Sequence, residues 1–177
     1  MFKQEVKDEF KIMFLGENKI GSKTTLINIL LGNKFVEDTE TNVCNSYEKM
    51  IIDLGNNNKK TFILWDILGQ KKYRTLAIFT FSQLDCAVLG YDVTRKETFE
   101  EIKKFWLPSL KEKNLDKLVY LLANKMDLYE INQVKREEAI EFAKKENLRF
   151  FEISCKTGSG IKEFFEDLKY NLLNKYK

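Results

Sequence analysis

The sequence predicts an α/β fold built on a mostly parallel sheet, and three observations support this prediction. The chain of 177 residues is 44% hydrophobic and 32% charged, which is the balance of a globular domain with one sizeable core. Short apolar runs bounded by turn residues alternate with longer helical patterns, which is the rhythm of βαβ units. No repeat, low-complexity tract or linker interrupts the alternation, so we expect one domain over residues 1–177.

The first half of the chain is expected to supply a strand, a helix and two further strands. These are, in order, Phe10–Leu15, Thr24–Leu31, Tyr47–Leu54 and Lys60–Trp65. The last two are separated by the cluster Gly55-Asn56-Asn57-Asn58, which is a turn signal and predicts an antiparallel hairpin. The polar stretch from Gly32 to Ser46 has no clear period and is expected to be a loose connection.

The second half is expected to supply three buried parallel strands and three helices. The strands are short continuous apolar runs at Cys86–Tyr91, Leu118–Ala123 and Phe150–Ser154. The helices have amphipathic patterns at Lys96–Lys113, Lys135–Glu146 and Gly160–Lys175. Pro108, the only proline, falls inside the first helix and is expected to bend it or to mark its last turns.

Composition excludes several classes of function. The net charge of +3 is too balanced for nucleic acid or an anionic membrane to be the main partner. Cys44, Cys86 and Cys155 are odd in number and widely spaced, and the sequence has no histidine, so a zinc site is not expected and the cysteines are interpreted as reduced thiols. No signal sequence or membrane span is evident, which predicts a cytoplasmic protein, or one that is anchored by something outside this sequence.

A candidate phosphate-binding loop lies between the first strand and the first helix. Its residues are Gly16, Glu17, Asn18, Lys19, Ile20, Gly21, Ser22, Lys23 and Thr24, followed by Thr25. In such a loop backbone amides surround an anion at the positive end of a helix, a lysine reaches the β- and γ-phosphates, and the next hydroxyl binds Mg²⁺.

The loop is one residue longer than the usual pattern, so two registers are possible. Counting from Gly16 puts Ser22 in place of the lysine, whereas counting from the helix puts Lys23 and Thr24 in their expected places. We favour the second register, because the helix fixes the direction of Lys23 while a loop can absorb an insertion.

A second constellation, Trp65-Asp66-Ile67-Leu68-Gly69-Gln70, ends a strand. An aspartate at this place can support Mg²⁺, and a glycine amide can meet a γ-phosphate. A glutamine beside them can orient the water that attacks, so Gln70 and Lys23 are the candidate catalytic residues.

A third constellation, Asn124-Lys125-Met126-Asp127, directly follows an apolar run. The Asp127 carboxylate can accept hydrogen bonds from N1–H and the exocyclic amine of guanine, a donor pair that adenine lacks. Asn124 can bond to the purine, and the stem of Lys125 can lie over the ring. The carboxylate would be left unpaired by adenine, at a cost of about 1–3 kcal/mol or more.

The fourth constellation, Glu152-Ile153-Ser154-Cys155-Lys156, ends the last strand, and its backbone amides could reach the guanine O6. All four constellations fall at the C-terminal ends of predicted strands, where open α/β sheets bind ligands. Their order follows one sequence of tasks, which are the phosphates, the metal with the γ-phosphate, and then the base.

With these motifs the chain resembles the Ras superfamily of small GTPases, and most closely its Rab branch, from about Lys11 to Lys175. Further matching segments are Tyr73-Arg74-Thr75-Leu76, Gly90-Tyr91-Asp92-Val93-Thr94 and Glu97-Thr98-Phe99. The resemblance implies the P-loop GTPase fold, a six-stranded sheet with one antiparallel edge strand and about five helices on both faces. It also implies GTP and GDP as ligands, Mg²⁺, and slow hydrolysis that partner proteins accelerate.

The resemblance further implies two switch segments, at about Asn33–Tyr47 and Asp66–Phe81. In the first, counting back from Tyr47 puts Asn42 where the family has a Mg²⁺-binding threonine, and Thr41 lies one position away. Either residue could serve as the metal ligand beside Thr24 and Asp66. No cysteine follows Cys155, so the sequence has no prenylation motif; we favour a tail trimmed from this chain, over a longer chain or an unlipidated protein.

The leading hypothesis is a guanine-nucleotide-binding switch that hydrolyses GTP slowly and regulates vesicle traffic in the manner of Rab proteins. Its expected partners are an exchange factor, a GTPase-activating protein and effectors, with no nucleic acid and no direct membrane anchor in this sequence. If a lipidated tail lies outside this chain, it would act on the cytosolic face of endomembranes. The alternatives are a nucleotide-bound scaffold that hydrolyses weakly, and an adenine-nucleotide kinase or ATPase, against which Asn124 and Asp127 argue.

Overall fold

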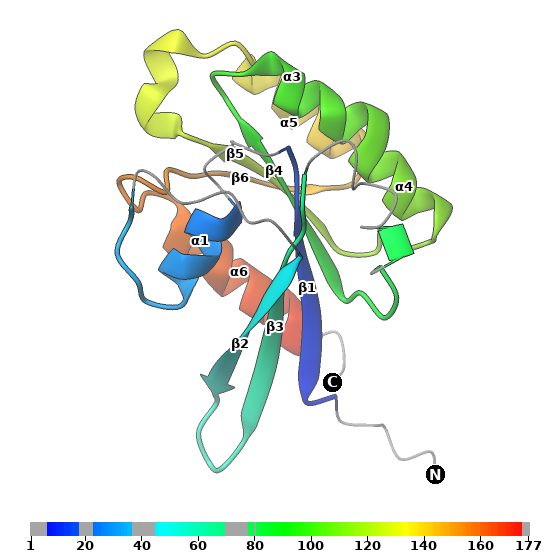
Figure 1. Ribbon diagram of the computed structural model, residues 1–177, viewed down its shortest axis with the longest axis vertical. Coiled ribbons are helices and arrows are strands. Elements are labelled where there is room, and N and C mark those ends of the chain that lie inside the picture. Colours follow the sequence, from blue (N-terminus) through cyan, green and yellow to red (C-terminus); the bar gives the residue numbers. More distant parts are fainter. Residues whose placement is uncertain (1–6, 18–22, 37–44, 70–77, 80, 175–177) are drawn as a thin grey trace.

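The computed structural model describes residues 7–17, 23–36, 45–69, 78–79 and 81–174. Six strands form one sheet in the order β2-β3-β1-β4-β5-β6 (Figure 1). The strands are β1 (Glu9–Leu15), β2 (Ser46–Asp53), β3 (Lys59–Asp66), β4 (Cys86–Asp92), β5 (Val119–Asn124) and β6 (Arg149–Glu152). Only β2 and β3 pair antiparallel, and the other neighbouring strands are parallel. The predicted mostly parallel sheet with one antiparallel edge strand is therefore confirmed.

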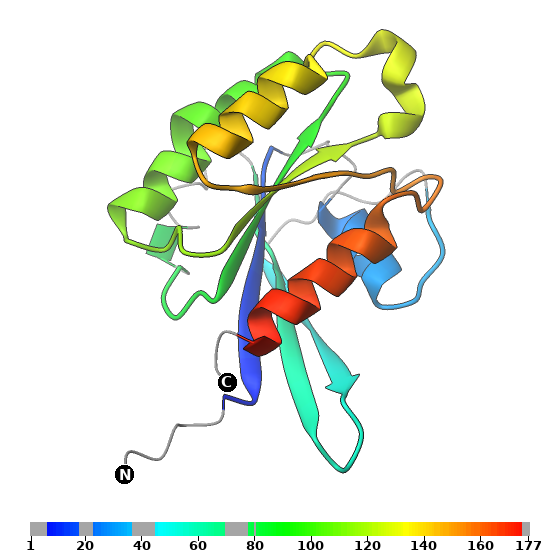
Figure 2. The ribbon, with the colours of Figure 1, turned by 180° about the vertical axis from the view of Figure 1, so that it is seen from behind.

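Helices cover both faces of this sheet (Figure 1, Figure 2). The helical elements are α1 (Lys23–Leu30), α3 (Lys96–Glu101), η2 (Ile102–Trp106), α4 (Leu107–Glu112), η3 (Met126–Ile131), α5 (Arg136–Lys145) and α6 (Ile161–Asn174). In both views α1 and α6 lie on one side of the sheet, and α3, α4 and α5 lie on the other. Within the described residues, no helix is long and apolar enough to span a membrane.

The core is divided by the sheet into two layers, because successive side chains of a strand point to opposite faces. On β1, Ile12 and Phe14 pack toward α1 and α6, whereas Met13 and Leu15 pack toward α3, α4 and α5. Every residue of β4 and β5 is buried. Burial on both faces explains why these strands read in the sequence as continuous apolar runs rather than as alternating ones.

The hairpin turn follows its predicted chemistry. The Leu54 amide donates to the Asn58 carbonyl at 2.9 Å, and the Asn58 amide donates to the Gly55 carbonyl at 2.9 Å. Gly55, Asn56 and Asn57 have φ angles of 78°, 52° and 59°. Glycine and asparagine are the residues that adopt positive φ most readily, so the cluster sets this turn.

The predicted helix at Lys96–Lys113 is interrupted by a π-helical turn, η2, which ends two residues before Pro108. The Leu107 amide donates to the Ile102 carbonyl, five residues back. A proline has no N–H and its ring clashes with the carbonyl four residues before it, so the regular α-helical ladder is broken at this position. Pro108 occupies the first turn of α4, where a missing N–H is tolerated.

Candidate functional site

The candidate site lies along the C-terminal edge of the parallel strands. Gly16 follows β1, Asp66 ends β3, and Asn124 ends β5. The fourth constellation begins in the last residue of β6 and continues into the loop, since β6 ends two residues earlier than predicted, at Glu152. Open α/β sheets bind ligands at this edge, where the chain diverges to either side of β1, which is the place that the sequence predicts.

In the candidate phosphate loop, Lys23 is the first residue of α1, and its side chain turns back toward the end of β1. Its ammonium donates to the carbonyl oxygens of Gly16 and Glu17, at 3.2 Å each. Thr25 lies in the first turn of α1 and is buried, at 2% exposure. The remaining residues expected here, Asn18, Lys19, Ile20, Gly21 and Ser22, lie outside the described residues.

The electrostatics around Lys23 favour an anionic ligand. Burial of the ammonium lowers the pKa of Lys23, and the carboxylates of Asp66 and Glu17 only partly oppose that shift. Two neutral carbonyl oxygens are weak partners for an ammonium that has lost its water. Phosphate oxygens would supply the missing negative charge, so Lys23 fits the role of a phosphate-binding lysine.

The candidate metal ligands meet where α1 begins and β3 ends. The Thr24 hydroxyl donates directly to the Asp66 carboxylate, which is 6% exposed. Hydroxyl and carboxylate oxygens are the ligands that Mg²⁺ prefers, and the metal usually keeps several waters and binds substrate phosphates. This pair therefore fits a Mg²⁺ ion beside the phosphate loop. Thr41 and Asn42, the alternatives for a further ligand, lie outside the described residues.

The second constellation is described as far as Gly69, and Gln70 lies outside the described residues. The Leu68 amide donates to the Asn45 side-chain oxygen at 2.8 Å. This bond joins the loop after β3 to the residue that precedes β2. Asn45 was not predicted as a site residue, because a lone asparagine in a polar connection carries no signal of a partner 23 residues away.

Asn124 and Asp127, the candidate base-recognition residues, are held by the loop that follows β6. Asn124 is 1% exposed, and its side-chain oxygen accepts from the Cys155 amide at 3.2 Å. The side-chain nitrogen of Asn124 is buried without a hydrogen-bond partner among the described residues. The Asp127 carboxylate accepts from the Ser154 hydroxyl at 2.5 Å. A buried donor without a partner is costly, so Asn124 has an unused N–H suited to a purine acceptor.

The loop after β6 is itself well fixed. Ser154 is fully buried, and its hydroxyl oxygen accepts from the Thr157 amide at 3.1 Å while the hydroxyl donates to Asp127. Burial raises the pKa of the Cys155 thiol to about 12, so the thiol is neutral at physiological pH. The hydrogen bonds of Ser154 therefore fix the direction of the Asp127 carboxylate even without a ligand.

A cavity of about 150 Å³ lies between the two candidate base-recognition loops, which follow β5 and β6. It is lined by Phe35, Asn124, Lys125, Asp127, Leu128, Cys155 and Lys156. Apolar side chains combined with one carboxylate suit a flat ring with a polar edge. Phe35 and Leu128 were not identified from the sequence; the only signal for Phe35 was an aromatic residue within the otherwise polar connection after α1.

Comparisons with known proteins agree with this geometry. The profile of the Ras family matches residues 11–174. GTP-binding protein YPT52 of Saccharomyces cerevisiae is 28% identical over 90% of this chain and 80% of its own length. Ras-related protein Rab-2B of Dictyostelium discoideum is 31% identical over 94% of this chain and 81% of its own. Ras-related protein Rab-17 of Mus musculus is 33% identical over 93% of this chain and 76% of its own.

The fold is that of P-loop GTPases, and the candidate site lies where such proteins bind nucleotide, so the chain is of the nucleotide-binding class. The comparisons identify the family. The chain belongs to the Ras family and is a Rab-like small GTPase. It is a GTP-binding molecular switch of vesicle traffic, it hydrolyses GTP to GDP, and it uses Mg²⁺. Proteins of this family interact with regulators and effectors.

Proposed function

We propose that this chain is an active switch, and we assign the binding of phosphate, Mg²⁺ and guanine, and the hydrolysis of GTP, to particular residues. Lys23 and the backbone of residues 16–25 bind the phosphates, and Thr24 with Asp66 holds the Mg²⁺. Asn124, Lys125, Asp127 and the loop Ser154-Cys155-Lys156 bind guanine. The observation that carries the proposal is the hydrogen bond from Ser154 to Asp127, which aims a carboxylate into the cavity before any base is bound.

Guanine selection follows from the chemistry of this set. The Asp127 carboxylate accepts from N1–H and the exocyclic amine of guanine, while the unused N–H of Asn124 meets an acceptor on the purine. Adenine offers neither donor to the carboxylate, so the lone pairs that Ser154 does not use would be covered without a partner, which costs about 1–3 kcal/mol or more.

Hydrolysis is assigned to Gln70, Lys23 and the metal pair. Thr24 and Asp66 would hold Mg²⁺, which would supply positive charge to offset the negative charge on the phosphates. Lys23 contributes a second positive charge to the phosphates, and Gln70 orients the attacking water. The role of Gln70 rests on the sequence.

The finer placement of the protein in the cell is also a proposal. We assign it an exchange factor, a GTPase-activating protein and effectors that read the two switch segments. It works in the cytoplasm, and on the cytosolic face of endomembranes if a lipidated tail lies outside this chain.

Single-turnover hydrolysis tests the proposal. Protein loaded with GTP and Mg²⁺ is expected to form GDP above the buffer background, and Gln70→Leu is expected to slow this step at least tenfold. Equilibrium affinity for GDP is measured on the same preparations and should not change. If the wild-type protein hydrolyses GTP no faster than Gln70→Leu, the catalytic assignment is wrong and the chain is a nucleotide-bound scaffold.

A further inference from the structure

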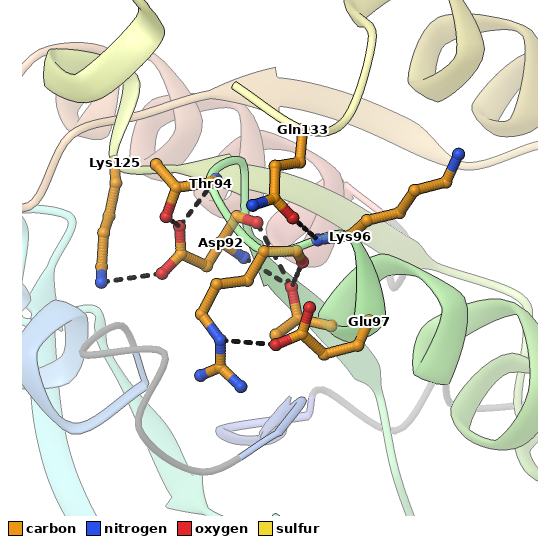
Figure 3. A network of polar contacts seen from close by, with 8 residues as sticks. Asp92, Thr94, Lys96, Glu97, Lys125 and Gln133 are labelled. Atoms are coloured by element: carbon orange, nitrogen blue, oxygen red, sulfur yellow. Dashed lines mark hydrogen bonds and ion pairs between the residues drawn. The ribbon is translucent and has the colours of Figure 1, made fainter. Parts of the chain in front are cut away.

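A buried carboxylate outside the four constellations lies beside the base-recognition loop. Asp92 is the last residue of β4, is 0% exposed, and stands opposite Asn124 in the register of β4 and β5. One carboxylate oxygen, Oδ1, accepts from the amide and from the hydroxyl of Thr94, at 2.9 Å and 2.7 Å. The other, Oδ2, forms an ion pair with the Lys125 ammonium at 2.7 Å. Figure 3 shows Thr94 and the extended Lys125 side chain converging on this carboxylate.

The ion pair fixes a residue that lines the guanine cavity. Lys125 forms part of the cavity wall, and its backbone has the left-handed conformation, with φ 68° and ψ 37°. Its side chain is 33% exposed, so without an anchor the ammonium would have access to water and many rotamers. Apart from Lys125, Oδ2 of Asp92 has no hydrogen-bond partner in the described part of the chain. The two groups therefore satisfy each other.

From this geometry we propose that Asp92 is a positioning residue for guanine binding, which acts by holding the stem of Lys125 against the base. Thr94 orients the carboxylate, and the carboxylate orients the lysine. The inference rests on the proposed function, because it assigns Lys125 to the guanine site. Pre-ordering the stem removes an entropy cost that guanine binding would otherwise meet, so loss of the anchor should speed nucleotide release.

The backbone around Asp92 is held by contacts that do not involve its carboxylate. The Asp92 amide donates to the Thr98 hydroxyl oxygen at 3.0 Å, and the Val93 amide donates to the Asn124 carbonyl at 3.1 Å. The Gln133 amide donates to the Val93 carbonyl at 2.8 Å. Asp92→Asn leaves these bonds in place and keeps an oxygen that can accept from Thr94. The substitution therefore isolates the charge.

The two sides of the ion pair are not equivalent as targets for mutation. Asp92→Asn removes the buried charge, and the partly exposed Lys125 can turn to water. Lys125→Met leaves a fully buried carboxylate with no cation, which destabilises the fold as well as the site. Asp92→Asn is consequently the informative variant, and Lys125→Met is expected to regain thermal stability when Asp92→Asn is added.

Release of fluorescently labelled GDP from the full chain, in Mg²⁺ and excess unlabelled GDP, tests this inference. Asp92→Asn is expected to release GDP about tenfold faster than wild type. Once Lys125 is methionine, adding Asp92→Asn should not speed GDP release any further, because the effect of the carboxylate acts through the lysine. Glu97→Gln is the matched control: it breaks the nearby 2.8 Å ion pair with Arg95 and should release GDP at the wild-type rate.

Three outcomes would overturn the inference: a wild-type release rate in Asp92→Asn, full multiplication of the two single effects, or an equal acceleration in Glu97→Gln. Should Asp92→Asn fail to fold, Thr94→Val removes only the 2.7 Å hydroxyl donor and should speed release about two- to threefold. A wild-type rate in Thr94→Val then refutes the inference. Failure of the wild-type protein to retain GDP would instead refute the proposed function, so the two failures are distinguishable.

Discussion

Ser154 is the side chain that sets the direction of the Asp127 carboxylate, and Ser154→Ala removes it with little change in volume. The hydroxyl is fully buried and donates to the carboxylate at 2.5 Å. A hydrogen bond to a charged group contributes about 1.5–3 kcal/mol, which corresponds to about a 10- to 150-fold loss of GDP affinity if it acts on the bound state. The Thr157 amide also loses its acceptor, so the loop loosens and the loss should fall toward the upper end.

Equilibrium titration with labelled GDP measures this loss directly. Ser109→Ala is the matched control, because Ser109 is another buried serine, at 9% exposure, but lies on α4 away from the cavity. The control should bind GDP as the wild type does. An affinity for GDP within twofold of wild type in Ser154→Ala would refute the reasoning that Ser154 pre-orients the base-recognition carboxylate.

Three further substitutions test the cavity and the fold. Phe35→Ala should weaken GDP binding about 5- to 150-fold in the same titration, because stacking of a base on an aromatic ring contributes about 1–3 kcal/mol. Burial raises the pKa of Asp167, but the hydrogen bond from Arg149 lowers it, and the result lies below 3.8. The stability that this carboxylate contributes is therefore present above pH 3.8 and is lost as the pH falls through the lowered pKa. In urea unfolding, Asp167→Asn should be less stable than wild type at pH 7, and its free energy of unfolding should fall less steeply with acid pH. Gly160→Ala should lower the free energy of unfolding by more than about 2 kcal/mol in the same assay, because the φ of Gly160 is 71° and a Cβ there would collide with a β6 carbonyl oxygen. Gly158→Ala is the control: its φ is 80° but no atom lies near the added Cβ, so it should lower the free energy of unfolding by only about 1–2 kcal/mol.

Much of the sheet could be predicted because burial on both faces makes its strands readable as apolar runs. The strand predicted at Cys86–Tyr91 ends one residue before β4 does, and the strand predicted at Leu118–Ala123 is shifted by one residue from β5. The hairpin was predictable because its turn requires residues that tolerate positive φ. By contrast, η3 begins after Lys125, which has a left-handed backbone conformation. Lysine rarely adopts this conformation, so the sequence gives no reason to expect it there.

The candidate site was predictable where its residues form local motifs, and not where they meet from distant segments. Asn124 and Asp127 belong to one short motif, so their proximity to each other at the end of β5 follows from spacing alone. The ion pair of Asp92 with Lys125 joins the ends of two strands, and Phe35 reaches the cavity from the connection after α1. Such contacts depend on strand order and side-chain direction, which a motif does not encode.

The central claim is that the cavity between the two base-recognition loops selects guanine. Its most direct test is equilibrium competition of labelled GDP, in Mg²⁺, by unlabelled GDP and ADP on the purified protein. We expect GDP to displace the label and ADP to compete more than about tenfold more weakly, because adenine offers the Asp127 carboxylate no donor beyond the hydroxyl of Ser154. Displacement by ADP at concentrations within tenfold of those needed for GDP would contradict the account.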